Sequence, residues 1–176
     1  MAKSFDQKSF FWVALLVLIA SVMSYSYGFR VGERKESYTF LRVIDGDTFS
    51  VESNKGKTEK KVRLLGIDAP KTGECASESA KEKLEILIGS GKFAINKVGD
   101  DNFGNTVANV LISDGDIAEK LLVEGLAKVD DGAKDNIGSE LKPKEEYLRV
   151  LRVAENKAKM DKIGIWSKEC VLQAPK

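Results

Sequence analysis

The chain of 176 residues contains no histidine, only three prolines and only two cysteines. Without histidine, the Ser-His-Asp and Cys-His types of catalysis are excluded, as are general acid–base catalysis by imidazole and metal sites with imidazole ligands. Any catalysis must therefore use carboxylates, lysines, arginines, tyrosines or a metal ion held by oxygen atoms. The hydrophobic fraction of 43% and the charged fraction of 31% are normal for a globular protein.

The sequence also lacks a strong net charge, which is +1 for the whole chain. Residues 1–37 hold five Lys/Arg and three Asp/Glu, and the remaining 23 basic and 24 acidic residues give the rest of the chain a charge of −1. Proteins that bind nucleic acid mainly by neutralising phosphates are usually clearly basic. The composition therefore argues mildly against tight non-specific binding of DNA.

One long apolar run lies near the N-terminus, where residues 9–29 contain no charged side chain. As a helix with a rise of about 1.5 Å per residue, this run is long enough to cross the hydrocarbon core of a bilayer. We expect an uncleaved signal anchor with a short linker in residues 1–37, followed by one domain in residues 38–176. A cleaved signal peptide is the alternative, because Ser24-Tyr25-Ser26 places small residues at the −3 and −1 positions of a cleavage site.

The two cysteines, Cys75 and Cys170, are 95 residues apart. An even pair in a chain with an export-type N-terminus is more often a disulfide than two free thiols, and a disulfide would place the domain outside the cytoplasm. Two unrelated buried cysteines are the alternative. We therefore expect a membrane-anchored or secreted protein whose domain is extracytoplasmic.

The pattern of apolar residues after the linker predicts five strands and three helices. The strands are expected at residues 41–44, 48–51, 61–67, 92–98 and 106–112, and the helices at residues 77–88, from Asp116 to Gly125, and from Pro143 onward. A helix after the third strand and two further helices after the last one favour an α+β fold. We expect a five-stranded OB-fold β-barrel, closed or partly open, with three helices against it.

Residues 42–70 place reactive side chains at the ends of the first expected strands. Asp47 follows a tight turn that begins at Asp45, and Asp68 follows the third strand, which carries Arg63. Two carboxylates and a guanidinium in such positions could bind a hard cation and a phosphate. The aspartates of the turn could instead merely cap it, which is common for the sequence Asp-Gly-Asp.

Five segments of the chain read VIDGDTFSV, VRLLGIDAP, DNFGNTVANVLI, EKLLVEGLAKV and AENKAKMDKIGIWS. In this order and spacing they resemble the staphylococcal nuclease (thermonuclease) family. The resemblance covers residues 38–170, which is nearly all of the chain after the linker. It implies an OB-fold barrel with three helices that hydrolyses DNA and RNA with Ca²⁺ as cofactor.

The resemblance also implies roles for individual residues. Asp47 and Asp68 would bind the metal through their carboxylates, Ala69 would bind it through its carbonyl, and Arg63 would hold a phosphate. These residue types suit those roles, because Ca²⁺ prefers several hard oxygen ligands and a guanidinium pairs well with phosphate. Phe103 stands where the family has a tyrosine near the nucleotide, so stacking on a base would be retained.

The positions of the two cysteines, one just after the DAP motif and one beyond the final tryptophan, resemble those in exported members of the family. This resemblance favours the Cys75–Cys170 disulfide over two unrelated thiols. It also supports the expectation of an extracytoplasmic domain.

Two catalytic positions depart from the family pattern. Lys71 stands where the family has a glutamate that acts as general base or orients the attacking water. Asn105 stands where the family has an arginine that stabilises charge in the transition state. A charged lysine accepts no proton and an asparagine brings no charge, although Glu74 could act as a substitute base.

We therefore expect a nuclease-like domain with weak hydrolysis of DNA or RNA. The alternative is a catalytically degenerate member that binds nucleic acid or phosphate, or that serves as an interaction module. Asp130 and Asp131 stand where the family has tyrosines, and their charge would repel a phosphate backbone. Nucleic acid is the candidate partner of the domain, the membrane is the partner of the N-terminal helix, and the domain is expected to be monomeric.

Overall fold

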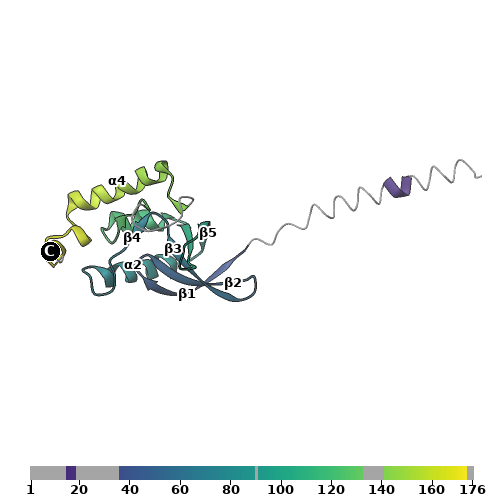
Figure 1. The fold of residues 1–176 in the computed structure, drawn as a ribbon, viewed down its shortest axis with the longest axis horizontal. Coiled ribbons are helices and arrows are strands. Elements are labelled where there is room, and N and C mark those ends of the chain that lie inside the picture. The colour runs from purple at the N-terminus through teal and green to yellow at the C-terminus, as the bar shows by residue number, and fades with distance from the viewer. Residues whose placement is uncertain (1–14, 19–35, 90, 133–140, 174–176) are drawn as a thin grey trace, which may run out of the picture. The chain divides into compact units, whose positions relative to one another are not determined.

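A computed structural model describes residues 15–18, 36–89, 91–132 and 141–173 (Figure 1). The chain divides into two units, Met1–Glu36 and Ser37–Lys176, and the second unit carries the sheets and helices considered below. Within the described ranges, no helix is long and apolar enough to cross a membrane. The predicted signal anchor falls almost entirely on residues outside these ranges, so it stays a prediction.

A six-stranded sheet forms the centre of the second unit (Figure 1). Its strands are β1 (Tyr38–Asp45), β2 (Thr48–Ser53), β3 (Thr58–Leu64), β5 (Phe93–Asp100), β6 (Thr106–Ile112) and β7 (Gly115–Asp116). Their order is β1-β2-β3-β6-β5, and β7 pairs with β6. The β3–β6 pair is parallel and the other pairs of this sheet are antiparallel. The parallel pair is possible because a helix and two strands separate β3 from β6 along the chain.

Within the described residues, a second sheet and four helices complete the unit. The short strands β4 (Ile67–Asp68) and β8 (Lys128–Val129) pair with each other. The helices are α2 (Ser77–Gly89), α3 (Ile117–Val123), α4 (Glu145–Asp161) and α5 (Lys168–Gln173), with the 3₁₀ turn η2 (Gly164–Trp166) before α5. Helix α2 packs against β1 and α3, and α3 packs against α4 and β6.

The structure confirms the α+β class but not the closed five-stranded barrel. Strands β1 and β5 lie at the two edges of the large sheet, and within the described residues they do not pair with each other. A closed barrel would need these two edge strands to pair, so the sheet is open within the described residues. Helix α5 is one more helix than expected.

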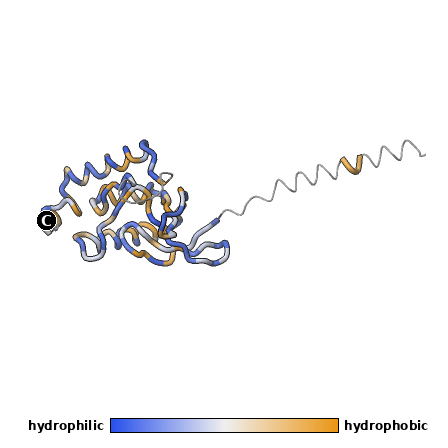
Figure 2. Tube along the Cα trace, viewed as in Figure 1, coloured by the Kyte–Doolittle hydropathy of each residue, from blue (hydrophilic) through white to orange (hydrophobic). Residues whose placement is uncertain are grey.

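Helix α4 shows how the apolar pattern produces the core. Its buried apolar residues recur on one face: Leu148, Leu151, Ala154 and Ala158. Apolar and polar stretches accordingly alternate along this helix (Figure 2). The helix begins at Glu145 and not at Pro143, because Lys144 keeps an extended backbone and forms the N-cap. The predicted helix is present, and its start lies two residues later than expected.

Asp116 links β6, α3 and α4 in a polar network. Its Oδ1 accepts hydrogen bonds from the backbone N–H groups of Ala118 and Glu119, at 2.7 and 3.4 Å, and so caps α3. Its Oδ2 accepts from the Tyr147 hydroxyl at 2.8 Å, and the Asn109 amide donates to that hydroxyl at 3.1 Å. The pKa of Tyr147 is raised above its ordinary value. Burial is the larger cause, and the negative charge of the Asp116 carboxylate is the second.

The predicted disulfide between Cys75 and Cys170 is present, with Cα atoms 5.4 Å apart. Cys75 lies just before α2 and Cys170 lies within α5. The bridge therefore ties the C-terminal helix to the loop between β4 and α2, which carries several of the candidate site residues.

Candidate functional site

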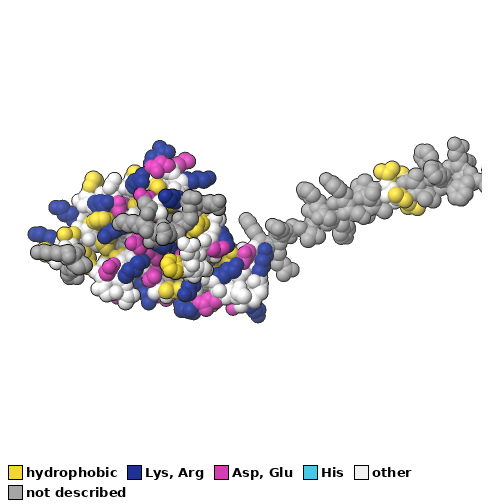
Figure 3. Space-filling view, in the orientation of Figure 1, with side chains coloured by type: hydrophobic (Ala, Val, Ile, Leu, Met, Phe, Trp, Pro, Cys, Tyr) yellow, Lys and Arg dark blue, Asp and Glu magenta, His cyan; other side chains and the backbone are white. Residues whose placement is uncertain are grey.

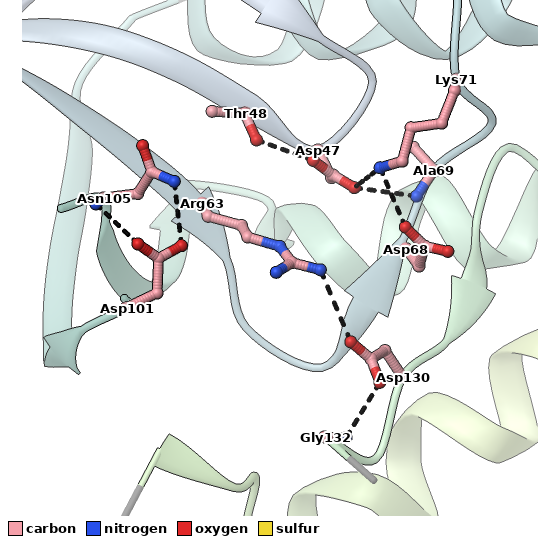
Figure 4. A network of polar contacts seen from close by, with 10 residues as sticks. All are labelled: Asp47, Thr48, Arg63, Asp68, Ala69, Lys71, Asp101, Asn105, Asp130 and Gly132. Atoms are coloured by element: carbon pink, nitrogen blue, oxygen red, sulfur yellow. Dashed lines mark hydrogen bonds and ion pairs between the residues drawn. The ribbon is translucent and has the colours of Figure 1, made fainter. Parts of the chain in front are cut away.

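Asp47 lies in the turn between β1 and β2 and is almost completely buried, at 1% exposure. Its Oδ1 accepts a hydrogen bond from the Thr48 hydroxyl at 2.7 Å, and its Oδ2 accepts from the Ala69 N–H at 2.9 Å (Figure 4). Burial raises the pKa of Asp47 above its ordinary value, although the Ala69 hydrogen bond acts to lower it. The carboxylate is thus held in one orientation.

Gly46, the residue before Asp47, lets this turn lie directly against α2. A Cβ atom at position 46 would lie 2.6 Å from the Cβ of Ala80 and 2.7 Å from the Cβ of Ala69. Carbon atoms in contact normally stay about 3.5–4.0 Å apart, so a side chain here would push the turn away from the helix. Glycine at this position therefore fixes where Asp47 lies.

The ammonium group of Lys71 lies between the two aspartates that the sequence predicted as metal ligands (Figure 4). Its Nζ is 3.0 Å from Asp68 Oδ1 and 3.6 Å from Asp47 Oδ2. Partial burial acts to lower the pKa of Lys71, but the carboxylates outweigh it and raise that pKa above its ordinary value. Lys71 is therefore a charged donor and cannot serve as a base.

Glu74, the candidate substitute base, has a different partner. Its Oε2 accepts a hydrogen bond from the Lys71 backbone N–H at 2.8 Å, and its own N–H donates to the Lys71 carbonyl at 2.8 Å. These two bonds close the turn that leads to Cys75 and α2. In this arrangement the carboxylate of Glu74 stabilises the loop.

Arg63, on β3, forms an ion pair with Asp130. Its Nη2 lies 3.6 Å from Asp130 Oδ2, and the two side chains are only 14% and 13% exposed (Figure 4). Asp130 follows β8, and its Oδ1 also accepts from the Gly132 N–H at 2.9 Å. A carboxylate of the chain itself therefore faces the guanidinium that was expected to hold a phosphate.

A cavity of about 570 Å³ lies beside this ion pair. It is lined by four basic residues, four acidic residues and one valine: Arg63, Lys71, Lys128, Arg152, Asp68, Asp130, Asp131, Glu155 and Val129. The surface seen in Figure 3 likewise mixes Lys/Arg with Asp/Glu. The cavity can take a polar or charged ligand, but its balanced charge attracts a polyanion only moderately.

The turn between β5 and β6 holds the remaining two candidates, and neither is among the residues that line this cavity. The Asn105 amide donates to Asp101 Oδ2 at 2.9 Å, and its N–H donates to Asp101 Oδ1 at 2.8 Å. Asn105 thus stabilises its own turn. The side chain of Phe103 is 86% exposed and available for contact.

The Asp47 and Asp68 site does not fit the Ca²⁺ ion that the family resemblance implies. Ca²⁺ takes about six to eight oxygen ligands at about 2.3–2.6 Å. Both carboxylate oxygens of Asp47 already accept hydrogen bonds, and the Lys71 ammonium lies where a shared cation would bind. No group of three or more acidic or cysteine side chains in the described part of the chain could hold a metal ion.

The sequence model described as staphylococcal nuclease homologue matches residues 61–168. This chain belongs to the staphylococcal nuclease family. It is 37% identical over 139 residues to the endonuclease YncB of Bacillus subtilis (strain 168), an alignment that covers 74% of this chain and 61% of that protein. The SPbeta prophage-derived endonuclease YokF of the same strain is 35% identical over 139 residues, covering 74% of this chain and 44% of that protein.

A thermonuclease of Staphylococcus intermedius is 28% identical over 169 residues, covering 89% of this chain and 93% of that protein. The chain thus spans about three fifths of the length of YncB and less than half of the length of YokF. It spans almost all of the staphylococcal thermonuclease. The residues that match the family model include Arg63, Asp68 and Lys71, whereas Asp47 precedes them.

For a member of the staphylococcal nuclease family, the site combines expected and unexpected neighbours. The structure brings Asp47, Asp68, Ala69 and Lys71 together. Arg63 lines the same cavity as Asp68 and Lys71. Sequence reasoning missed that Asp130 pairs with Arg63, since no local pattern connects residues on two different sheets. It also missed Asp101 as the partner of Asn105, although an aspartate followed by a glycine-containing turn is a usable signal.

Proposed function

We propose that this domain binds nucleic acid at the cavity beside Arg63 and hydrolyses phosphodiester bonds only weakly. One observation carries the proposal: the Lys71 Nζ lies 3.0 Å from Asp68 Oδ1 and 3.6 Å from Asp47 Oδ2. A charged ammonium has no lone pair with which to take a proton from water. Loss of a general base costs about 10²–10⁴-fold in rate, and loss of one charge stabiliser about 10²–10³-fold.

Binding is supported by the groups that line the cavity. The guanidinium groups of Arg63 and Arg152 can each make paired hydrogen bonds to a phosphate, and Lys128 adds a positive charge. The exposed ring of Phe103 can stack on a base. Because acidic residues line the same cavity, we expect modest affinity, which falls as the salt concentration rises. The two Bacillus relatives are named as endonucleases, which supports nucleic acid as the ligand class.

A domain that binds without any hydrolysis is the second candidate. It is favoured by Asp130, whose carboxylate lies 3.6 Å from the Arg63 guanidinium, where an incoming phosphate would have to bind. Under this alternative the domain serves as a nucleic-acid or phosphate-binding module, or docks onto a partner.

Cleavage and binding measured side by side distinguish these candidates. The full chain, kept in mild detergent because of its apolar N-terminal run, is incubated with labelled single-stranded DNA with Ca²⁺ or with EDTA. Slow cleavage that is lost in Asp47→Ala supports the weak nuclease. No cleavage, with binding retained, supports the second candidate. Cleavage that appears or rises in Lys71→Glu identifies the lysine as the cause of the low rate.

Binding that Arg63→Ala leaves unchanged would contradict every version of the two candidates in which Arg63 holds the phosphate. Lys92→Ala serves as the matched control, because Lys92 is exposed and is not among the residues that line the cavity. This control should bind DNA as the native chain does.

We also propose that the domain is exported, by anchoring or by secretion, and acts as a monomer. The Cys75–Cys170 disulfide and the uncharged run of residues 9–29 support export. Fractionation of cells with protease added from outside tests this location, and the mass of the mature chain shows whether the N-terminus is cleaved. A domain that resists external protease until the cells are lysed would contradict it.

A further inference from the structure

We propose that Lys71 replaces the divalent cation of this site, so that its ammonium group holds the Asp47 and Asp68 carboxylates together and makes the domain independent of Ca²⁺. The inference rests on the proposed function in one respect, because it takes the cavity to bind a phosphodiester. With Lys71 in place of the cation, that binding needs no metal ion.

The two carboxylates create a need for positive charge at this point. Asp47 is 1% exposed, and a buried carboxylate is costly unless it is paired and hydrogen-bonded. The Thr48 hydroxyl and the Ala69 N–H donate to its two oxygens, and Lys71 adds a full positive charge at 3.6 Å. The same ammonium lies 3.0 Å from Asp68 Oδ1, so one side chain offsets the repulsion between two carboxylates.

The backbone around Lys71 holds the side chain in this position. Two hydrogen bonds of 2.8 Å between Lys71 and Glu74 close this turn. The next residue, Cys75, is linked to α5 by its disulfide. The long side chain then returns to the carboxylates from a fixed starting point. An ammonium is a compact charge with three donors, which suits contact with more than one carboxylate.

A metal ion and this ammonium cannot share the site. Ca²⁺ would need oxygen atoms at about 2.3–2.6 Å on the side of Asp47 and Asp68 that Lys71 already contacts. Displacing the lysine exposes Ca²⁺ to a like charge a few ångströms away, which lowers its affinity by about 10-fold or more. The Lys71 side chain is also 58% exposed and lines the cavity, so its ammonium can donate to a bound phosphate.

Calorimetric titration of Ca²⁺ alone into the full chain tests this inference without nucleic acid. Lys71→Met removes the charge at nearly constant length and should bind Ca²⁺ at least about 10-fold more tightly than the native chain. The control is Lys97→Met, since Lys97 pairs with Asp100 at 2.5 Å, outside the residues that line the cavity, and should bind Ca²⁺ as the native chain does. Equal Ca²⁺ affinity of the native chain and Lys71→Met overturns the inference.

Thermal unfolding keeps the test decisive if Lys71→Met is poorly folded. Ca²⁺ should raise the melting temperature of this variant and leave that of the native chain unchanged. Lys71→Arg keeps the positive charge, so it should remain folded and insensitive to Ca²⁺. A rise with Ca²⁺ in the native chain, or an equal rise in Lys71→Arg and Lys71→Met, overturns the inference.

Fluorescence anisotropy with a labelled oligonucleotide separates this inference from the proposed function. Equal affinity in Ca²⁺ and in EDTA supports the replacement of the divalent cation by Lys71. An affinity that increases with Ca²⁺ overturns this inference, whereas the proposed binding of nucleic acid stands. If no oligonucleotide binds in either buffer, the proposed function fails, and the Ca²⁺ titration still decides the role of Lys71.

Discussion

The guanidinium of Arg63, on the large sheet, lies 3.6 Å from the carboxylate of Asp130, which follows a strand of the small sheet. Both side chains are largely withdrawn from solvent, so the pair is screened less than a surface ion pair. A phosphate that approaches Arg63 must compete with this carboxylate.

Asp130→Asn should therefore raise the affinity for a short single-stranded oligonucleotide by about 3- to 10-fold, because it removes a negative charge from the binding position. Anisotropy at several salt concentrations measures this change. Asp114→Asn makes the same substitution at an exposed residue that pairs with Lys120, so it should leave the affinity unchanged. Equal affinities for both variants and the native chain would show that Asp130 does not compete with phosphate.

Gly46→Ala should lower the free energy of unfolding by about 1–3 kcal/mol, since the new methyl group would meet Ala80 and Ala69 at 2.6 and 2.7 Å. Gly89→Ala is the matched control, because no atom lies within 4 Å of a Cβ at that position, at the end of α2. Urea unfolding of both variants gives the comparison. A stability loss of equal size in the two variants would mean that the close approach of the turn to α2 is not the cause.

Tyr147 should make the domain sensitive to alkaline pH. Because its pKa is raised in the folded state above the ordinary 10.0, the folded chain keeps this proton at pH values where the unfolded chain loses it. The stabilisation is fully present below pH 10.0 and declines above it, by up to about 1.4 kcal/mol per pH unit.

Tyr147→Phe removes this group together with its hydrogen bond to Asp116, so it should cost about 1–2 kcal/mol at neutral pH. The difference from the native chain should shrink as the pH rises above 10.0. Unfolding in urea between about pH 8 and about pH 11 measures it. A constant difference over that range would contradict the prediction.

Loss of the Cys75–Cys170 disulfide should lower the free energy of unfolding by at most about 4–5 kcal/mol, the chain-entropy value for a loop of this length. Urea unfolding with and without reductant measures the change in the native chain. The double variant Cys75→Ser/Cys170→Ser should match the reduced native chain and show no response to reductant. Reductant that leaves the native chain unchanged, with the thiols shown to be exposed by alkylation, would refute the estimate.

Elements with a strong local pattern could be predicted from the sequence. Strand β6 has the predicted bounds, Thr106–Ile112, and α2 differs from its prediction only by including Gly89. The strands β4 and β8 have two residues each and exist only because Ile67 and Val129 pair across a long sequence separation. Whether the edge strands β1 and β5 meet likewise depends on contacts between distant parts of the chain, so the local pattern did not exclude a closed barrel.

The residue types of the candidate site can be read from the sequence, whereas their arrangement cannot. The loss of a base at Lys71 follows from the chemistry of lysine, but the two distances from its ammonium to Asp47 and Asp68 depend on the folded loop. Asp130 was expected only to repel phosphate, and its pairing with Arg63 depends on the contact between two sheets. Charge can be read from a sequence, whereas the partner of each charge requires the fold.

The Cys75–Cys170 bridge also determines how the chain responds to mechanical tension. Residues 75–170 form a covalently closed loop, so a pull on the two ends of the chain bypasses α2, β5, β6 and α4. Only β1 to β4 and the last residues can extend under load. A force applied between the N-terminal run and the C-terminus would therefore extend the segment that carries Asp47 and Asp68, whereas residues 75–170 cannot be stretched end to end while the bridge is intact.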